Sequence, residues 1–459
     1  MRGVENSTEK TVAPHGKLLK ILGVTFGIAV TIGSMIGLGI LRTPGSVAAQ
    51  LGSVWLILVI WILGGAYSIL GTLSVAELST SLPQAGGWYV YARRTFGDYG
   101  GFVVGWSDWL VNCATNAFVA ITVGEYLIAL VPALAGSVRV IALISLFLFA
   151  LLNWVGVRSG SRFQEVTSFL KAFAFLILVI ACFANGARHP LAGAEPATLH
   201  PPIGVLALFV AVMLALQSVI FTYDGWYNAI YFAEEDRDPS RNLPRSMIFG
   251  VISVMFLYLL VNLALFYILA LPQIAASTLP ASAAAQAVFG AAGSQIISLL
   301  ALLTLPSILN INFMVAPRIL FAMSRDGLFA AQMATLNSGG TPVAALLLSA
   351  ITMVLLVVTG TFEILLSITA FLIVLNYTSG FLAVFILRHR EPNLPRPFKA
   401  WGYRWTTLLV LLGSLIFLIG QIISDTRNSL YALGLIVASY PVFLLTKKLK
   451  KRESQIAAE

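Results

Sequence analysis

The sequence is poor in charge, in cysteine and in histidine. Of its 459 residues only 10% are charged, whereas 58% are hydrophobic, and the mean hydropathy is +0.90. Soluble domains carry about 25% charged residues, so this composition excludes a soluble protein and predicts an integral membrane protein. The two cysteines, Cys113 and Cys182, both lie inside apolar runs and predict neither a disulfide framework nor a metal site. The four histidines are scattered, so we expect no metal, no cofactor and no enzyme centre.

Long apolar runs are abundant, and a bilayer-spanning helix needs about 20 such residues. We predict twelve spans near residues 18–42, 54–80, 101–131, 138–157, 163–185, 204–233, 246–270, 294–323, 342–360, 363–387, 405–424 and 429–446. Most of the 28 lysines and arginines fall in alternate connections. The positive-inside rule therefore places both termini in the cytoplasm and explains the net charge of +9 without a nucleic acid partner.

The predicted domain organisation is a single transporter-like membrane domain over residues 17–446. Residues 1–16 form a cytoplasmic tail without the features of a signal peptide, and residues 447–459 form a basic cytoplasmic tail. We expect that tail to lie against anionic headgroups of the bilayer.

The first span contains three glycines within seven residues, Gly33, Gly37 and Gly39. Each costs about 1 kcal/mol relative to alanine in a helix interior, so a break in the helix is one interpretation. The amides freed at such a break would bind an anion such as a carboxylate. Close packing of two helices through small residues is the alternative.

The sixth span repeats this anomaly, because Asp224 and Gly225 lie in its middle. An acidic residue costs about 2.5–3.5 kcal/mol in the hydrocarbon region and marks a functional site by default. Interrupted spans in corresponding positions of two inverted repeats indicate the binding site of a solute transporter. Spans one and six are five apart, which favours two five-helix repeats, about 17–185 and 204–387, followed by two extra helices at about 405–446.

Several motifs resemble those of the amino acid–polyamine–organocation superfamily, and in particular L-type amino acid transporters and their bacterial relatives. They follow in order along almost the whole chain: Gly33–Ile40 (GSMIGLGI), Pro83–Tyr89 (PQAGGWY), Phe221–Trp226 (FTYDGW), Glu234–Glu235 before Asp238–Pro239, Arg241–Pro244 (RNLP), Arg318–Gly327 (RILFAMSRDG) and Arg388–Lys399 (RHREPNLPRPFK). The resemblance implies an all-α integral membrane protein with twelve transmembrane helices. It also implies the 5+5 inverted-repeat fold of sodium–leucine symporters, with discontinuous helices 1 and 6.

The resemblance also implies where an amino acid substrate would bind. Its carboxylate would meet the amides of Gly37, Leu38 and Gly39, although relatives commonly have a serine where this chain has Leu38. Its α-amino group would meet backbone carbonyls, and aromatic and polar side chains would complete the pocket. The residues implied for these roles are Met35, Phe221 and Asp224 through their backbone carbonyls, Phe221 as an aromatic lid, and Tyr227 and Asn312 as pocket walls.

Lys171 is a second charge within a predicted span. It could be a lysine that reaches the cytoplasmic surface along the helix. By resemblance, its ammonium would instead occupy the place of a sodium ion and hold the first span against the fifth and eighth. Asp224 likewise has two interpretations: it selects a cationic or polar side chain, or it caps the broken helix or pairs with a protein donor.

The predicted function is therefore an amino acid permease of the plasma membrane, the inner membrane if the source is bacterial. It would move small neutral L-amino acids without sodium, by exchange or proton symport. A cationic amino acid or polyamine transporter and a non-transporting nutrient sensor are the alternatives. The outer loop at 131–139 lacks the cysteine through which animal L-type transporters join a heavy chain, so we expect no disulfide-linked partner.

Overall fold

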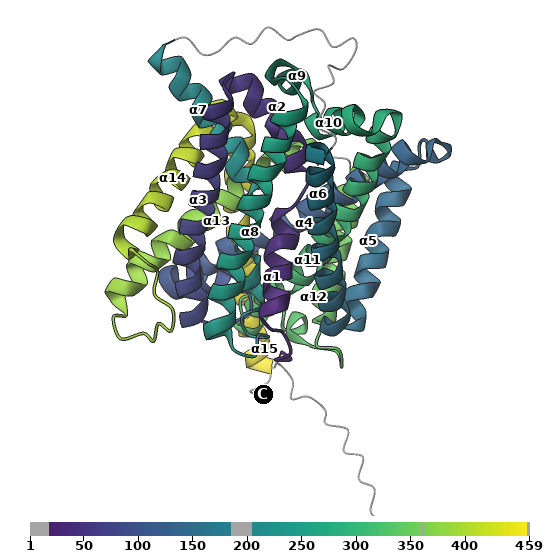
Figure 1. Ribbon diagram of the computed structural model, residues 1–459. Coiled ribbons are helices and arrows are strands. Elements are labelled where there is room, and N and C mark those ends of the chain that lie inside the picture. The colour runs from purple at the N-terminus through teal and green to yellow at the C-terminus, as the bar shows by residue number, and fades with distance from the viewer. Residues whose placement is uncertain (1–17, 185–203, 360–361, 457–459) are drawn as a thin grey trace, which may run out of the picture.

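The computed structural model describes residues 18–184, 204–359 and 362–456, and for 362–367 and 449–456 it describes the backbone only. The predicted tail at residues 1–16 lies outside the described residues. All regular elements in these ranges are helices, accompanied by two isolated β-bridges, Leu22 with Asp236 and Leu336 with Pro342. The helices run roughly side by side in one bundle (Figure 1).

The long helices in chain order are α3 (Val54–Ser81), α4 (Trp88–Leu130), α5 (Val138–Val155), α6 (Val157–Ala184), α7 (Val205–Thr222), α8 (Pro239–Ile268), α11 (Gly293–Arg325), α12 (Val343–Thr359), α13 (Phe362–Arg390), α14 (Tyr403–Ser424) and α15 (Thr426–Ile456). Two shorter helices, α1 (Val24–Met35) and α2 (Gly39–Leu51), form a bent pair. The remaining elements are η1 (Pro132–Leu134), η2 (Asn228–Phe232), α9 (Leu271–Ala276), α10 (Pro280–Phe289), η3 (Gly290–Ala292) and η4 (Ala331–Ala334).

The prediction of an all-helical, multi-span membrane protein is confirmed. Ten helices in the described part of the chain are long and apolar enough to cross a membrane, and the bent pair α1–α2 raises the number to 11. The remaining predicted span, 342–360, corresponds to α12, an apolar helix that the structure describes over only 17 residues. Twelve spans therefore remain a prediction.

Helix α4 differs from its predicted span of 101–131, because it begins 13 residues earlier, at Trp88. The predicted spans leave Arg93 and Arg94 in the connection between residues 80 and 101, and this prediction is wrong. The segment is helical because one face buries Trp88, Tyr89 and Tyr91 in the bundle while the arginines point outward. The change of direction that we attributed to a loop occurs at Gly97, whose φ of 81° lies in the region that glycine tolerates. The predicted tail from residue 447 is likewise helical, as the last turns of α15.

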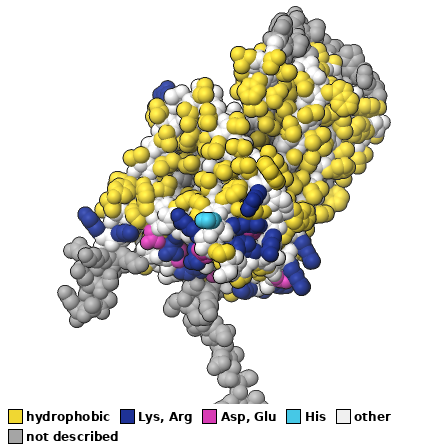
Figure 2. All heavy atoms as spheres, turned by 90° about the vertical axis from the view of Figure 1, so that its left-hand side faces the viewer, with side chains coloured by type: hydrophobic (Ala, Val, Ile, Leu, Met, Phe, Trp, Pro, Cys, Tyr) yellow, Lys and Arg dark blue, Asp and Glu magenta, His cyan; other side chains and the backbone are white. Residues whose placement is uncertain are grey.

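The two ends of the bundle differ in charge. Figure 2 shows hydrophobic side chains over the body of the molecule and lysine and arginine side chains gathered at one end. We call this the basic end and define it by the arginines that make ion pairs there: Arg93, Arg94, Arg318, Arg325 and Arg388. A band of apolar surface bounded by a cationic rim is the pattern expected of a protein embedded in a bilayer.

Candidate binding site between two interrupted helices

The two predicted breaks lie in direct contact. Helix α1 ends at Met35, α2 begins at Gly39, and their axes differ by 44°. Helix α7 ends at Thr222, and Gly225 follows with a φ of +96°. A Cβ atom placed on Gly225 would lie 2.6 Å from the Cβ of Ser34, so the chain needs glycine both for this backbone conformation and for the close approach.

Hydrogen bonds and close contacts join the breaks on both sides of this point. On one side, Asn228 Nδ2 donates to Ser34 Oγ at 2.8 Å. On the other, the Thr43 and Thr222 hydroxyls are 2.7 Å apart, and a Cβ on Gly39 would lie 2.9 Å from Thr222 Cγ2. Gly39 of the first span thus allows close approach to the sixth, so both interpretations of the glycine-rich stretch, helix break and small-residue packing, apply to this structure.

The first break is also partly open. Ser34, Gly37, Leu38 and Gly39 are partly exposed, whereas their neighbours Met35, Ile36 and Ile40 are buried. The first amides of α2 lack acceptors within the helix, as at every helix start, and carry the positive end of its dipole. An anionic group placed at this recess would meet backbone donors.

Tyr258 of α8 connects the ends of the two helices, a role that the sequence did not suggest. Its hydroxyl donates to the Met35 carbonyl at 2.6 Å and lies 3.3 Å from the Thr222 carbonyl. The Met35 oxygen, which we expected to meet a substrate amino group, therefore already has one donor. Its second lone pair is the one that a substrate would use. A tyrosine in an apolar span is the only signal for this residue.

Lys171 is completely buried on α6 and does not extend to the surface. Its Nζ donates to the Gly33 carbonyl at 2.5 Å, the Ile36 carbonyl at 2.7 Å and the Ser307 hydroxyl of α11 at 2.6 Å. An ammonium group has three protons, and here each has an acceptor. The charge lies at the negative end of the α1 dipole and joins α1 to α6 and α11, the contact that the resemblance implied.

Asp224 lies beside the second break and is partly exposed. Its carboxylate accepts a short hydrogen bond from the hydroxyl of Tyr377 on α13. Tyr227 is buried, with its ring centroid 5.0 Å from Trp88 and 5.3 Å from Tyr377. Trp226 packs on the same group of rings. This geometry matches the interpretation in which Asp224 pairs with a protein donor, and it places Tyr227 in an aromatic wall.

Phe221 is exposed at the surface in this structure. Its side chain is 38% exposed and borders a hollow of about 500 Å³, which Arg42 and Thr43 of α2 and Ser277 also line. This hollow lies at the end of the bundle opposite the basic end, where α2, α7 and α9 meet (Figure 1). The role of Phe221 as a lid over the substrate stays a prediction.

Asn312 on α11 is 6% exposed, and its amide nitrogen has no hydrogen-bond acceptor among the described residues. It lies one helical turn after Ile308, whose side chain faces Gly37: a Cβ on that glycine would lie 3.5 Å from Ile308 Cδ1. Residues four apart share a helix face, so Asn312 points toward the first break. A buried amide without an acceptor needs a partner such as a water or a ligand.

Asp108 of α4 was not singled out from the sequence, yet it is almost completely buried. Both of its carboxylate oxygens lie near the hydroxyl of Tyr231, at 2.9 and 2.8 Å. No lysine or arginine forms an ion pair with it within the described ranges. The signal was present in the sequence as an acid inside the third span, but only the fold shows that η2 supplies its partner.

The basic end is closed by ion pairs. Glu234 binds Arg325 at 2.7 Å, and Glu235 binds Arg318 through two hydrogen bonds of 2.5 and 2.8 Å. Arg93 and Arg94 pair with other acidic residues. The additional pairs are Arg93 with Asp98 and Asp326, Arg94 with Glu391, and Arg388 and Arg396 with Glu77.

Backbone pairing strengthens this closure. The Leu22 amide donates to the Glu235 carbonyl at 3.0 Å, and the Arg237 amide donates to the Leu22 carbonyl at 3.1 Å. Asp236 lies between Glu235 and Arg237 in the chain. Burial raises the pKa of its carboxyl, while hydrogen bonds from Asn242 and from the backbone counteract part of that shift. The chain before α1 is thereby attached to the chain that follows η2, and the recess is shut on this side.

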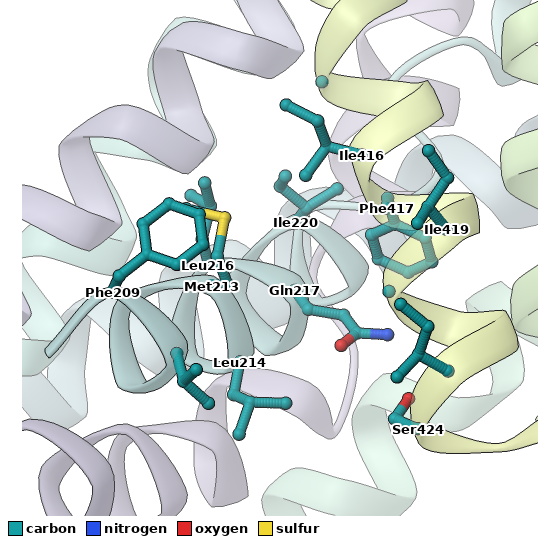
Figure 3. A pocket seen from close by; sticks show the side chains of 14 residues that line it. Phe209, Met213, Leu214, Leu216, Gln217, Ile220, Ile416, Phe417, Ile419 and Ser424 are labelled. Atoms are coloured by element: carbon teal, nitrogen blue, oxygen red, sulfur yellow. The ribbon is translucent and has the colours of Figure 1, made fainter. Parts of the chain in front are cut away.

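A second hollow, of about 360 Å³, lies between α7 and α14 (Figure 3). Phe209, Met213 and Ile416 are among its apolar walls, and Gln217 is the polar side chain in its centre, 2.5 Å from Gln421. It shares no residue with the breaks and belongs to the outer surface of the bundle.

Two interrupted helices in contact, with a charged anchor behind them, define an integral membrane carrier rather than an enzyme. Comparison with known proteins identifies the family: a family model described as amino acid permease matches residues 23–440, and the chain belongs to this family. It is 28% identical to the serine/threonine exchanger SteT of Bacillus subtilis, over 94% of this chain and 98% of that protein. It is 30% identical to the human large neutral amino acids transporter small subunit 2, over 83% and 72%. The mouse Asc-type amino acid transporter 1 is 28% identical, over 93% and 81%.

Proposed function

We propose that this protein exchanges small neutral L-amino acids across the plasma membrane by alternating access and without sodium. The observation that carries the proposal is the contact of the two breaks at Ser34 and Gly225, with the Lys171 ammonium on the carbonyls that end α1. The names of the relatives support amino acids as substrates, and the name of the Bacillus subtilis protein supports exchange. Proton symport is the second possible mode.

In the proposed binding pose the carboxylate of the substrate lies at the amides of Gly37, Leu38 and Gly39. The amino group faces the carbonyls of Met35, Phe221 and Asp224, where two helix ends present partial negative charge. Tyr227 and Asn312 border the side chain of the substrate. The partial exposure of the first break and the free amide of Asn312 support this arrangement.

The proposed topology has twelve spans, two inverted repeats of five, and the basic end in the cytoplasm with both termini. The gathering of arginines at one end and the spacing of the two breaks support it. With this orientation the structure is closed toward the cytoplasm, and the hollow beside Phe221 is the external approach to the site.

The pairing of Asp224 with Tyr377 argues against the cationic alternative, because the carboxylate already has a protein donor. The deciding experiment is uptake of labelled serine, threonine, alanine, leucine and arginine into proteoliposomes that hold the purified chain. It is run with and without internal substrate, with a pH gradient, and with sodium replaced by choline. We expect uptake to require internal amino acid and to be unchanged when sodium is replaced by choline. Uptake driven by the pH gradient alone would indicate symport, and no uptake of any substrate would favour a sensor or a chain that needs a partner.

A further inference from the structure

The largest of the described hollows lies at the basic end, away from the proposed substrate site. It has a volume of about 640 Å³ and is formed by the turn between α5 and α6, the loop before α12, and the segment that leads into α1. Its polar lining includes Arg158, Ser159 and Arg162 of α6, and Leu19 and Val155 contribute apolar wall.

The walls of this hollow are held by backbone contacts. The Val157 amide donates to the Gly339 carbonyl at 3.0 Å, and Asn337 Nδ2 donates to the Trp154 carbonyl at 2.7 Å. A Cβ on Gly156, which has a φ of +144°, would lie 2.8 Å from Gly339. The turn between α5 and α6 is therefore in contact with the loop before α12. The hollow is therefore a built feature of the fold and not a gap between loose loops.

The two arginines in it differ from the other arginines of the basic end. Arg158 and Arg162 are exposed, and neither forms an ion pair within residues 18–184, 204–359 and 362–456. Glu165, one turn along α6, attracts Arg162 without pairing with it. The first turn of α6 adds its own backbone amides and the positive end of its dipole. The hollow thus presents two uncommitted guanidinium groups to an anion.

The surface beside the hollow indicates the source of that anion. Trp154, Val155 and Val166 are 46%, 71% and 66% exposed, so the surface beside the hollow is apolar. A guanidinium pair at the edge of such a surface lies at the depth of the headgroups, where basic pockets bind anionic lipids. We propose that this hollow binds the phosphate of an anionic phospholipid, with an acyl chain along the exposed face of α5 and α6.

A lipid in this position would contact the gate at the basic end. Leu19, in the wall of the hollow, packs on Gly340, and three residues later the Leu22 amide donates to the Glu235 carbonyl. A headgroup held by Arg158 and Arg162 would keep the segment leading into α1 in its closed position. The lipid would be a ligand of the proposed transporter. Its binding rests on the proposed function only for which leaflet of the bilayer the lipid belongs to.

The test measures binding without transport, so that its failure cannot be confused with failure of the proposed function. Native mass spectrometry of the purified full chain would count bound phosphatidylglycerol and phosphatidylcholine at matched concentrations, with inorganic phosphate as a third arm. The test variant is Arg158→Gln with Arg162→Gln. The control is Arg245→Gln with Arg404→Gln, two exposed arginines of the same end that line no part of the hollow.

We expect phosphatidylglycerol to bind in preference to phosphatidylcholine and the test variant to lose roughly tenfold to thirtyfold in affinity. The control should keep the preference of the wild type. Equal binding of the two lipids by the wild type, or an equal loss in both double variants, would overturn the proposal. Displacement of phosphatidylglycerol by millimolar inorganic phosphate would identify a free-anion site and would overturn the lipid as the ligand.

Discussion

Replacement of Lys171 by alanine tests the centre of the proposed mechanism. The substitution removes three hydrogen bonds of 2.5 to 2.7 Å from a completely buried cation and leaves the carbonyls of Gly33 and Ile36 without their donor. Leaving a buried acceptor without its donor costs about 1–3 kcal/mol, and two carbonyls lose the ammonium here. Because these carbonyls end α1 at the first break, the loss acts on the geometry of the site. We expect uptake to fall roughly a hundredfold or more.

Uptake of labelled serine into proteoliposomes, corrected for the amount of folded protein, measures this effect. Lys399→Ala is the matched control, since Lys399 is exposed and forms no ion pair among the described residues. Ser307→Ala is a milder second variant that removes one of the three acceptors, with an expected cost of about 1–3 kcal/mol. It keeps the test informative if the alanine variant of Lys171 does not fold.

The ion dependence of the wild type completes the test. If the ammonium takes the place of a sodium ion, replacement of sodium by choline should leave uptake unchanged. Wild-type rates in Lys171→Ala, or a steep dependence of the unmodified protein on sodium, would refute the reasoning.

Four further predictions follow from the contacts described. Gly225→Ala should lower thermal stability and uptake, because its Cβ would lie 2.6 Å from a neighbouring Cβ at a φ of +96°, whereas Gly434→Ala, with nothing within 4 Å, should change neither. Asp224→Asn should reduce competition by arginine, serine, alanine and leucine alike; a selective loss for arginine would instead assign this residue to side-chain selection. Tyr231→Phe should destabilise the protein by about 1–3 kcal/mol in a thermal unfolding assay, because it leaves the buried Asp108 carboxyl without its hydroxyl donor, and an unchanged melting temperature would contradict this. The purified chain alone should transport, and a requirement for an added partner subunit would disprove that expectation.

The sequence predicted the two helix breaks because their signals are local. Glycines and an acid in an apolar span are anomalous wherever they occur, so the breaks at Gly37 and Asp224 were found without a structure. The partners across the site were not found. Tyr258 and Tyr231 look like ordinary apolar residues in the sequence, and helices that are buried on several sides have no polar face whose periodicity would orient them. Arg93 was predicted to lie in a connection because two adjacent charged residues are typical of a loop. One buried face is nevertheless enough to continue the helix through this residue.

The ion pairs of the basic end fall into two classes, and the difference bears on how this end would open in the proposed alternating access. The pair of Glu234 and Arg325 keeps side-chain exposures of 20% and 28%, and exposed pairs contribute about 0–1 kcal/mol each. The pair of Glu235 and Arg318 is almost completely buried, at 0% and 4%. Separating buried charges is costly, so opening through this pair would require water to enter as the charges part. The backbone carbonyl of Glu235 also accepts the hydrogen bond from the Leu22 amide. In the proposed alternating access, the movement that opens the basic end would therefore either hydrate Glu235 or carry it together with Arg318, and the exposed pairs alone would not set the barrier.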